Sequence, residues 1–177
     1  MNTYIALFRG INVGGNNILP MKALVTILES LGCQNVKTYI QSGNVAFRHP
    51  EGQKNVLKEN IGNAIDTRHG FKPHILLLDQ TEFKNAVTQN PYPVDDGKAL
   101  HVFFLATKAE NPDLNALEAL KTPTESFTLT QSCFYLHAPD GIGRSKLATK
   151  VEKTLGVPAT ARNWNTVDKL NTMIATI

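Results

Sequence analysis

The stretch Tyr4-Ile5-Ala6-Leu7-Phe8 is a continuous apolar run that stops at Arg9. A run of this length, followed by a loop rich in glycine and asparagine, is typical of a buried strand. The loop extends to Asn17, and Pro20 suits the first turn of a helix. That helix is indicated by apolar residues at helical spacing, namely Met21, Leu24, Leu28 and Leu31. The chain therefore begins with a strand, a loop and a helix.

The same alternation continues through the first half of the chain. The expected elements are a strand from Val36 to Gln41, a bend at Ser42-Gly43-Asn44, a strand from Val45 to Phe47, a helix from Lys54 to His69 and a strand from His74 to Leu78. Strand, helix, strand, strand, helix, strand is the ferredoxin-like order. In that order the first and third strands are central neighbours, so we expect Asn44 to lie near the strand that carries Arg9.

The second half of the chain repeats this order of elements. After a linking helix over 80–89, the stretch Asn90-Pro91-Tyr92-Pro93 marks a boundary, which predicts subdomains at 1–90 and 91–177. The later elements are a strand over 100–106, a helix capped by Asn111-Pro112-Asp113 and ending near 120, a hairpin over 126–130 and 133–137, a helix after Gly141-Ile142-Gly143 that buries Leu147, Val151 and Leu155, and a helix from Trp164. We therefore predict an α+β fold of two ferredoxin-like (βαββα-type) subdomains with mixed or antiparallel sheets.

Composition narrows the class of protein. With 42% hydrophobic and 19% charged residues, the chain is expected to bury a core. The apolar runs are shorter than the roughly 20 residues that a membrane-spanning helix needs, and no signal peptide is recognisable, so we expect a cytoplasmic protein without a membrane partner. Cys33 and Cys133 are expected to be buried free thiols, and the five scattered histidines have no metal-site spacing. The sequence identifies no cofactor.

Charge is distributed unevenly along the chain. Residues 1–50 carry a net charge of +3, residues 51–140 carry −4, and residues 141–177 carry +4. If the two basic ends meet in space, they form a positive region that attracts an anion. A solvated surface with an accidental asymmetry is the alternative.

The first candidate cluster is the loop after the first strand, with the helix start behind it. Arg9 provides a planar donor suited to phosphate or carboxylate, and Lys22 adds a cation in the first helical turn. The remaining predicted ligand-binding residues of this loop are Asn12, Gly14, Gly15 and Asn16. Neither a Walker loop nor a GxGxxG pattern is present. Tight-turn chemistry is a sufficient alternative explanation for the glycines.

Two further clusters contribute polar groups. Ser42 and Asn44 belong to the bend Gln41-Ser42-Gly43-Asn44, whose side chains could instead bond to their own backbone. Arg162 and Asn163 precede Trp164, where an asparagine could simply cap the last helix. A weaker fourth element is Gly141-Ile142-Gly143-Arg144-Ser145-Lys146, in which glycines again precede a cationic turn.

None of the four clusters contains an aspartate, glutamate, histidine or cysteine. General acid–base catalysis needs a group that titrates near neutrality, and a serine nucleophile needs a base beside it. Only a distant partner such as His101 or His137 could supply one. With no recognisable catalytic motif, binding is favoured over catalysis, and whether the protein is an enzyme stays open.

The quoted motifs resemble a known family. Arg9-Gly10-Ile11-Asn12-Val13-Gly14-Gly15-Asn16-Asn17, Met21-Lys22-x-Leu24, Thr38-Tyr39-Ile40-Gln41-Ser42-Gly43-Asn44-Val45-x-Phe47 and Ala161-Arg162-Asn163-Trp164-Asn165-Thr166-Val167 are similar to the signature of the domain-of-unknown-function 1697 family of uncharacterised bacterial proteins. The resemblance covers nearly the whole chain. It implies two α+β subdomains with ferredoxin-like topology and implies no established activity.

Four functional hypotheses follow. The first is a site for a small anionic or nucleotide-type ligand between the subdomains, built from the residues named above. The second is single-stranded nucleic-acid binding on a sheet that exposes aromatics such as Tyr39 and Phe47. The third is an enzyme with catalytic groups from distant segments, and the fourth is a non-enzymatic partner-binding module.

Overall fold

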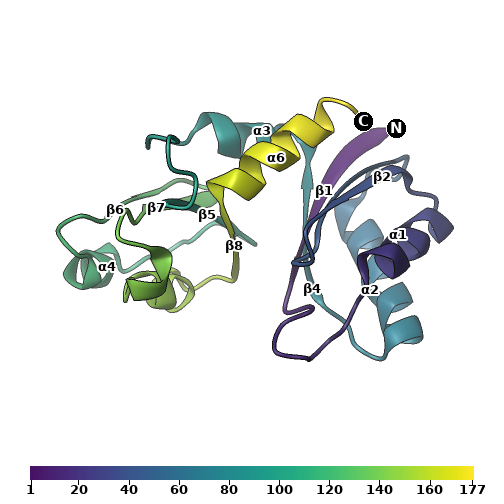
Figure 1. Ribbon diagram of the computed structural model, residues 1–177, viewed down its shortest axis with the longest axis horizontal. Coiled ribbons are helices and arrows are strands. Elements are labelled where there is room, and N and C mark those ends of the chain that lie inside the picture. Colours follow the sequence, from purple (N-terminus) through teal and green to yellow (C-terminus); the bar gives the residue numbers. More distant parts are fainter. The chain divides into compact units, whose positions relative to one another are not determined.

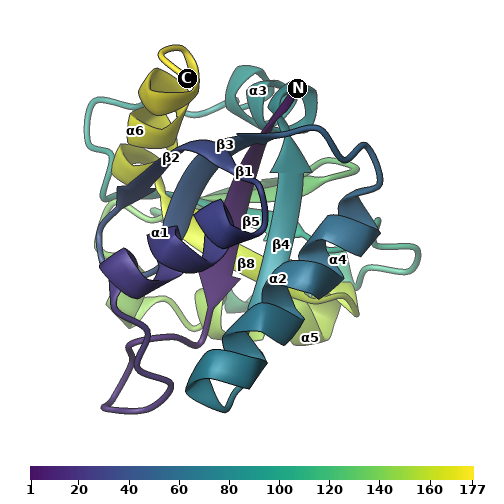
Figure 2. The same ribbon diagram turned by 90° about the vertical axis from the view of Figure 1, so that its right-hand side faces the viewer.

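The computed structural model describes residues 1–177, which form two compact units. The first unit contains Met1–Asn85 together with Lys169–Ile177, and the second contains Ala86–Asp168. The second unit is thus contiguous in sequence, whereas the first is completed by the C-terminal segment. Both ends of the chain lie at the same end of the first unit (Figures 1 and 2).

The first unit is a four-stranded antiparallel sheet with two helices on one face. Its elements are β1 (Asn2–Arg9), α1 (Met21–Ser30), β2 (Gln34–Tyr39), β3 (Asn44–His49), α2 (Lys54–His69) and β4 (His74–Asp79). The strand order is β2-β3-β1-β4, so β1 and β3 are the central neighbours, as predicted. Figure 2 shows α1 and α2 across the near face of this sheet.

The core of the first unit is built on every second side chain of β1, since successive side chains of a strand point to opposite faces of the sheet. Tyr4, Ala6 and Phe8 point to the face covered by the helices and pack with Val45 and Phe47 of β3. The two helices contribute apolar residues to the same core, namely Leu24, Ile27, Leu28, Leu57, Ile61 and Ile65. The next helix, α3 (Gln80–Thr88), starts directly after β4 and leads into the second unit.

The second unit has the same connectivity. Its elements are β5 (Leu100–Leu105), α4 (Leu114–Leu120), β6 (Ser126–Leu129), β7 (Cys133–His137), the 3-10 turns η1 (Ile142–Arg144) and η2 (Ala148–Lys150), α5 (Val151–Leu155) and β8 (Ala159–Asn163). The sheet is antiparallel with the order β6-β7-β5-β8. The last helix, α6 (Trp164–Ile174), begins in this unit and ends in the first. The predicted α+β class with two ferredoxin-like arrangements is therefore confirmed.

The predicted helix after Gly141-Ile142-Gly143 is wrong in its form. The segment folds as two 3-10 turns and a five-residue helix, because Ser145 is extended with φ −78° and ψ 110° and Lys150 departs from helical geometry with φ −112° and ψ 0°. Leu147, Val151 and Leu155 are nevertheless buried in the core of this unit, as expected. Figure 1 shows α4 on the same side of the sheet as these turns.

The strand β8 was missed by the sequence analysis. Its residues Ala159-Thr160-Ala161-Arg162-Asn163 lack an apolar alternation, so they carry no period-two signal. The strand is formed by pairing with β5 from His101↔Asn163 to Leu105↔Ala159. Tertiary context thus decides this element. None of the helices in the chain combines the length and the apolar character needed to cross a membrane.

Candidate functional site

The loop between β1 and α1 is held in shape by Asn12. Its amide nitrogen donates to the carbonyls of Leu19 and Gln41, both at 2.9 Å, and its oxygen accepts from the Leu19 amide at 2.8 Å. Asn12 therefore ties the loop to α1 on one side and to the β2–β3 bend on the other. The loop also contains several residues with left-handed φ between 50° and 75°, namely Gly10, Asn12, Gly14, Gly15 and Asn17.

The bend between β2 and β3 uses its polar side chains internally. Asn44 is fully buried, and its amide donates at 3.0 Å to both the Tyr39 carbonyl and the Ser42 hydroxyl. The backbone partner of Asn44 across the sheet is Leu7, which lies on the strand that carries Arg9. Asn44 thus lies near that strand, as predicted, but its amide is satisfied inside the unit.

Gly43 in this bend has no room for a side chain. The amide of Phe8 donates to its carbonyl at 2.9 Å, and its φ is +79°. A Cβ added at Gly43 would lie 2.6 Å from Phe8 Cβ and 2.7 Å from Ile11 Cδ1. The glycine is therefore required by close packing of the bend on β1.

The remaining predicted residues of the loop are exposed. Gly14, Gly15 and Asn16 form its tip, and Lys22 lies in the first turn of α1 with no carboxylate partner. The N-cap residue of α1 is Pro20, and no side chain bonds to the first amides of this helix. Arg9 ends β1 and already has an interaction partner in the chain.

Arg162 and Asn163 belong to the second unit, unlike the other predicted residues. The Asn163 side chain accepts from the Thr166 amide at 3.0 Å and so caps α6, which was the alternative explanation for this residue. Arg162 donates to the Ala161 carbonyl at 2.9 Å. Burial lowers the pKa of Arg162 to about 10, so the guanidinium still carries its charge at neutral pH.

Candidate nucleophiles and bases in the second unit are not paired. Ser145 is buried, and its hydroxyl accepts from the Ala148 amide at 3.0 Å. His101 Nδ1 is buried without a hydrogen-bond partner, and burial lowers the pKa of this imidazole. His137 stacks on the Tyr92 ring. No hydrogen bond joins either histidine to a serine, so no serine–histidine arrangement forms there.

Both cysteines are buried and free, as expected. Burial raises the pKa of Cys33 to about 12 and that of Cys133 to about 11. Because a thiolate is the reactive form of cysteine, these thiols are poor nucleophiles at neutral pH.

A groove in the first unit was not foreseen from the sequence. It has a volume of about 920 Å³ and lies where the start of β1, the end of β3, the start of α3 and the C-terminal segment meet. Its lining includes the side chains of Arg48, Lys54, Lys84 and Asp79. This volume falls in the range of small-molecule sites, roughly 300–1,000 Å³. We call it the terminal groove.

One wall of the terminal groove is fixed by the start of α3. The Glu82 amide donates to Asp79 Oδ1 at 2.9 Å, and the Asp79 amide donates to Glu82 Oε2 at 2.9 Å. This reciprocal pair is a capping box. Lys54 forms an ion pair with Glu82 and lies 4.0 Å from Asp79, so the charge of Lys54 is matched by carboxylates.

Arg48, which also lines the terminal groove, differs from Lys54 because it has no carboxylate partner. It lies on β3 opposite Thr3 of β1 and Gln34 of β2, and its side chain is half-buried. It forms no ion pair and no hydrogen bond with any other side chain. The terminal groove therefore contains a guanidinium without an internal carboxylate, a group that binds planar oxyanions well.

The fold and these sites define an α+β protein built from two units of one topology, with a polar groove in the first. The chain belongs to the family described as Protein of unknown function (DUF1697), whose model matches residues 1–135. The resemblance at Ala161–Val167 lies outside the matched residues. No curated protein matches the chain.

Among solved structures, the chain is similar to the conserved bacterial protein SP0830 from Streptococcus pneumoniae. The two are 24% identical, with a TM-score of 0.73, and the match covers 98% of each chain. This likeness supports the fold of the whole chain.

Proposed function

We propose that the first unit binds a small anionic ligand of nucleotide size in the terminal groove. The observation that carries this proposal is the unpaired, half-buried Arg48 in the wall of a cavity of about 920 Å³. A partly buried cation attracts an anion more strongly than a fully hydrated one, because the effective dielectric constant around it is lower.

The charges around the groove support an anion over a cation. Among the cationic side chains of its lining, Lys54 is paired with Glu82 and Lys84 has an interaction within the chain, whereas Arg48 has no ion pair. The Asp79 carboxylate is already engaged, since its Oδ1 accepts the Glu82 amide within the capping box. The C-terminal segment contributes only Ile174, Ala175 and Ile177 to this groove, so the basic residues of 141–177 do not add to its charge.

The glycine-rich loop is a poorer place for the ligand. The side-chain amides of Asn12 and Asn44 already donate hydrogen bonds within the first unit. Arg9 has a partner in the chain. Only Lys22 remains as an exposed cation without a carboxylate beside it. A ligand at this loop would be held mainly by backbone amides, with little charge to select it.

A sheet platform for nucleic-acid bases receives no support from Phe47. This residue is fully buried and packs against Tyr4 with ring centroids 5.9 Å apart. The expectation that Phe47 is an exposed stacking residue is wrong, because it points to the face covered by α1 and α2. Stacking readout needs exposed rings on the sheet.

The test is calorimetric titration with pyrophosphate and with adenosine nucleotides. We expect Arg48→Gln to weaken binding at least tenfold, whereas Arg68→Gln serves as the matched control because Arg68 bonds to Ser30 outside the groove. A ligand at 100 times its Kd should stabilise the protein by about 2.7 kcal/mol. Binding that survives Arg48→Gln and is lost in Lys22→Gln would move the site to the loop and contradict the proposal.

A further inference from the structure

The segment from Arg144 to Lys153 concentrates the positive charge of the second unit. It contains Arg144, Lys146, Lys150 and Lys153 against a single acid, Glu152, a net charge of +3. The rest of Ala86–Asp168 has a net charge of −4. The charges of this unit are therefore segregated, whereas an ordinary solvated surface mixes both signs.

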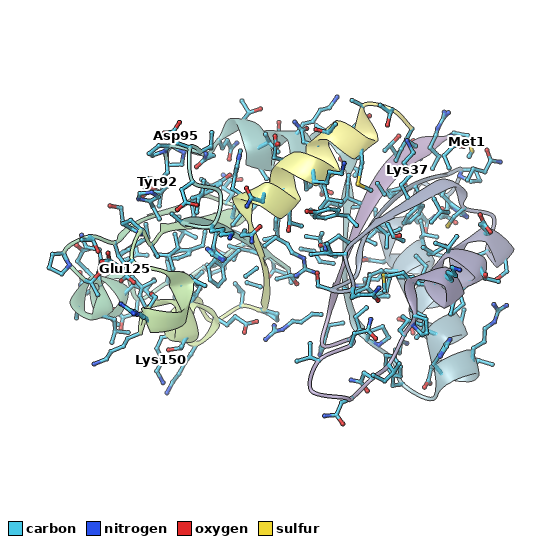
Figure 3. All side chains as sticks on the ribbon, viewed as in Figure 1. Met1, Lys37, Tyr92, Asp95, Glu125 and Lys150 are labelled. Carbon is cyan, nitrogen blue, oxygen red and sulfur yellow. The ribbon has the colours of Figure 1, made fainter.

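The cations of this segment face solvent without acidic partners. All four are exposed, and none forms an ion pair. The nearby Glu152 carboxylate accepts the Ala159 amide at 2.9 Å. Elsewhere in the unit, Lys121 pairs with Glu118 at 3.3 Å. Figure 3 shows Lys150 at the edge of the second unit.

The lysines lie on the exposed side of a short irregular segment whose apolar residues are buried. Residues 146–155 comprise a turn, η2 and α5. Lys146, Lys150 and Lys153 are all exposed, although they belong to the turn, to η2 and to α5, respectively. Leu147, Val151 and Leu155 occupy the buried face. We call the three lysines together with Arg144 the basic stripe.

Folding alone does not account for the basic stripe. Like charges close together in the sequence repel each other, and no ion pair offsets them here. A partner with regularly repeated negative charges would remove this repulsion. The segment contains no large exposed apolar residue of the kind that anchors a helix in a membrane.

We propose that the basic stripe binds the phosphate backbone of a single-stranded nucleic acid. The contacts are between lysine or arginine nitrogens and phosphate oxygens, and they carry no base specificity because no aromatic side chain lies in the segment for stacking. The basic stripe shares no residue with the terminal groove, so this proposal can be tested independently of the proposed anion site.

The test is fluorescence anisotropy with a labelled twelve-residue oligothymidylate. With about four phosphate contacts, the slope of log K against log salt should be about −2.8, since each contact contributes about −0.7 for single strands. Affinity should then fall about 50-fold between 50 and 200 mM salt. In the triple variant Lys146→Gln, Lys150→Gln, Lys153→Gln the slope should become less negative, about −0.7, because one contact remains.

The matched control is the double variant Lys98→Gln, Lys108→Gln, which removes exposed lysines of the same unit outside the stripe. It should leave the slope unchanged. If circular dichroism shows that the triple variant is unfolded, the single variant Lys150→Gln is measured instead. Its slope should be less negative than that of the unmodified protein by about 0.7. An unchanged slope in the stripe variants, or tighter binding to polyglutamate or to phosphatidylserine vesicles than to the oligonucleotide, overturns the proposal.

Discussion

The bend between β2 and β3 and the bend between β6 and β7 occupy the same position in the two units. In each, a carbonyl of the bend accepts an amide of the central strand at 2.9 Å: Gly43 from Phe8, and Ser132 from Leu105. The first bend contains left-handed residues at Ile40 and Gly43. The second contains none, and closes through Thr130, whose hydroxyl bonds with both the amide and the carbonyl of Cys133 at 3.1 Å.

This difference shows which features the topology requires and which it does not. Both bends dock on the central strand, so docking is a property of the fold. Left-handed residues within the bend, and the hydrogen bonds of Asn12 that hold the bend, occur only in the first unit. Because ordinary backbone suffices in the second unit, the loop and bend of the first unit form a local structure that the sequence maintains against strain.

The largest effect is expected at Gly43. Gly43→Ala forces a Cβ to within 2.6 Å of Phe8 Cβ at a left-handed φ, and should destabilise the first unit by about 3 kcal/mol or more. Hydrogen exchange of the β1 and β3 amides reports this unit separately. The control Gly15→Ala also has a left-handed φ, but nothing lies within 4 Å of its added Cβ. Equal losses from both variants would show that crowding plays no part.

Asn12→Ala should have the next largest effect. It removes three hydrogen bonds and leaves the Leu19 amide without its side-chain acceptor, at a cost of about 2 kcal/mol. The comparison in the second unit is Thr130→Val, which should cost about 1 kcal/mol because it removes only the hydroxyl contacts to Cys133. Urea unfolding followed by amide exchange measures both. A larger loss in Thr130→Val would reverse the comparison.

The smallest effect is a gain in stability. Ile40 is β-branched, 52% exposed, and held at a φ of 52°. Ile40→Asn should stabilise the first unit by about 1 kcal/mol, since asparagine tolerates the left-handed region. Gln131→Asn in the other bend relieves no strain and should change stability by less than about 0.5 kcal/mol. A loss of stability in Ile40→Asn would mean that the exposed isoleucine side chain makes contacts that outweigh its backbone strain.

Elements with a strong local pattern were predictable from the sequence. The helix from Lys54 to His69 begins and ends as expected, because its apolar face and the glycine at its C-cap are both visible locally. Asp113 caps α4 as predicted, by accepting the Ala116 amide. The strand β8 was not predictable, since its formation depends on β5 rather than on its own residues.

The terminal groove could not be predicted for a related reason. Its residues come from distant segments, and Arg48 looks like any exposed strand residue until its lack of a carboxylate partner is known. A capping box was readable at Asp79-Gln80-Thr81-Glu82, directly after an apolar strand. That signal would have located the wall of the groove, although not the cavity beside it.

The order in which the chain is synthesised acts differently on the two units. The second unit is continuous, so it can fold as soon as residue 168 has emerged from the ribosome. The first unit is translated earlier, but it is complete only once Lys169–Ile177 has been added. This segment includes Thr176, whose hydroxyl accepts a hydrogen bond from the Lys37 ammonium at 2.8 Å. The half of the protein that is translated first is therefore the half that is finished last.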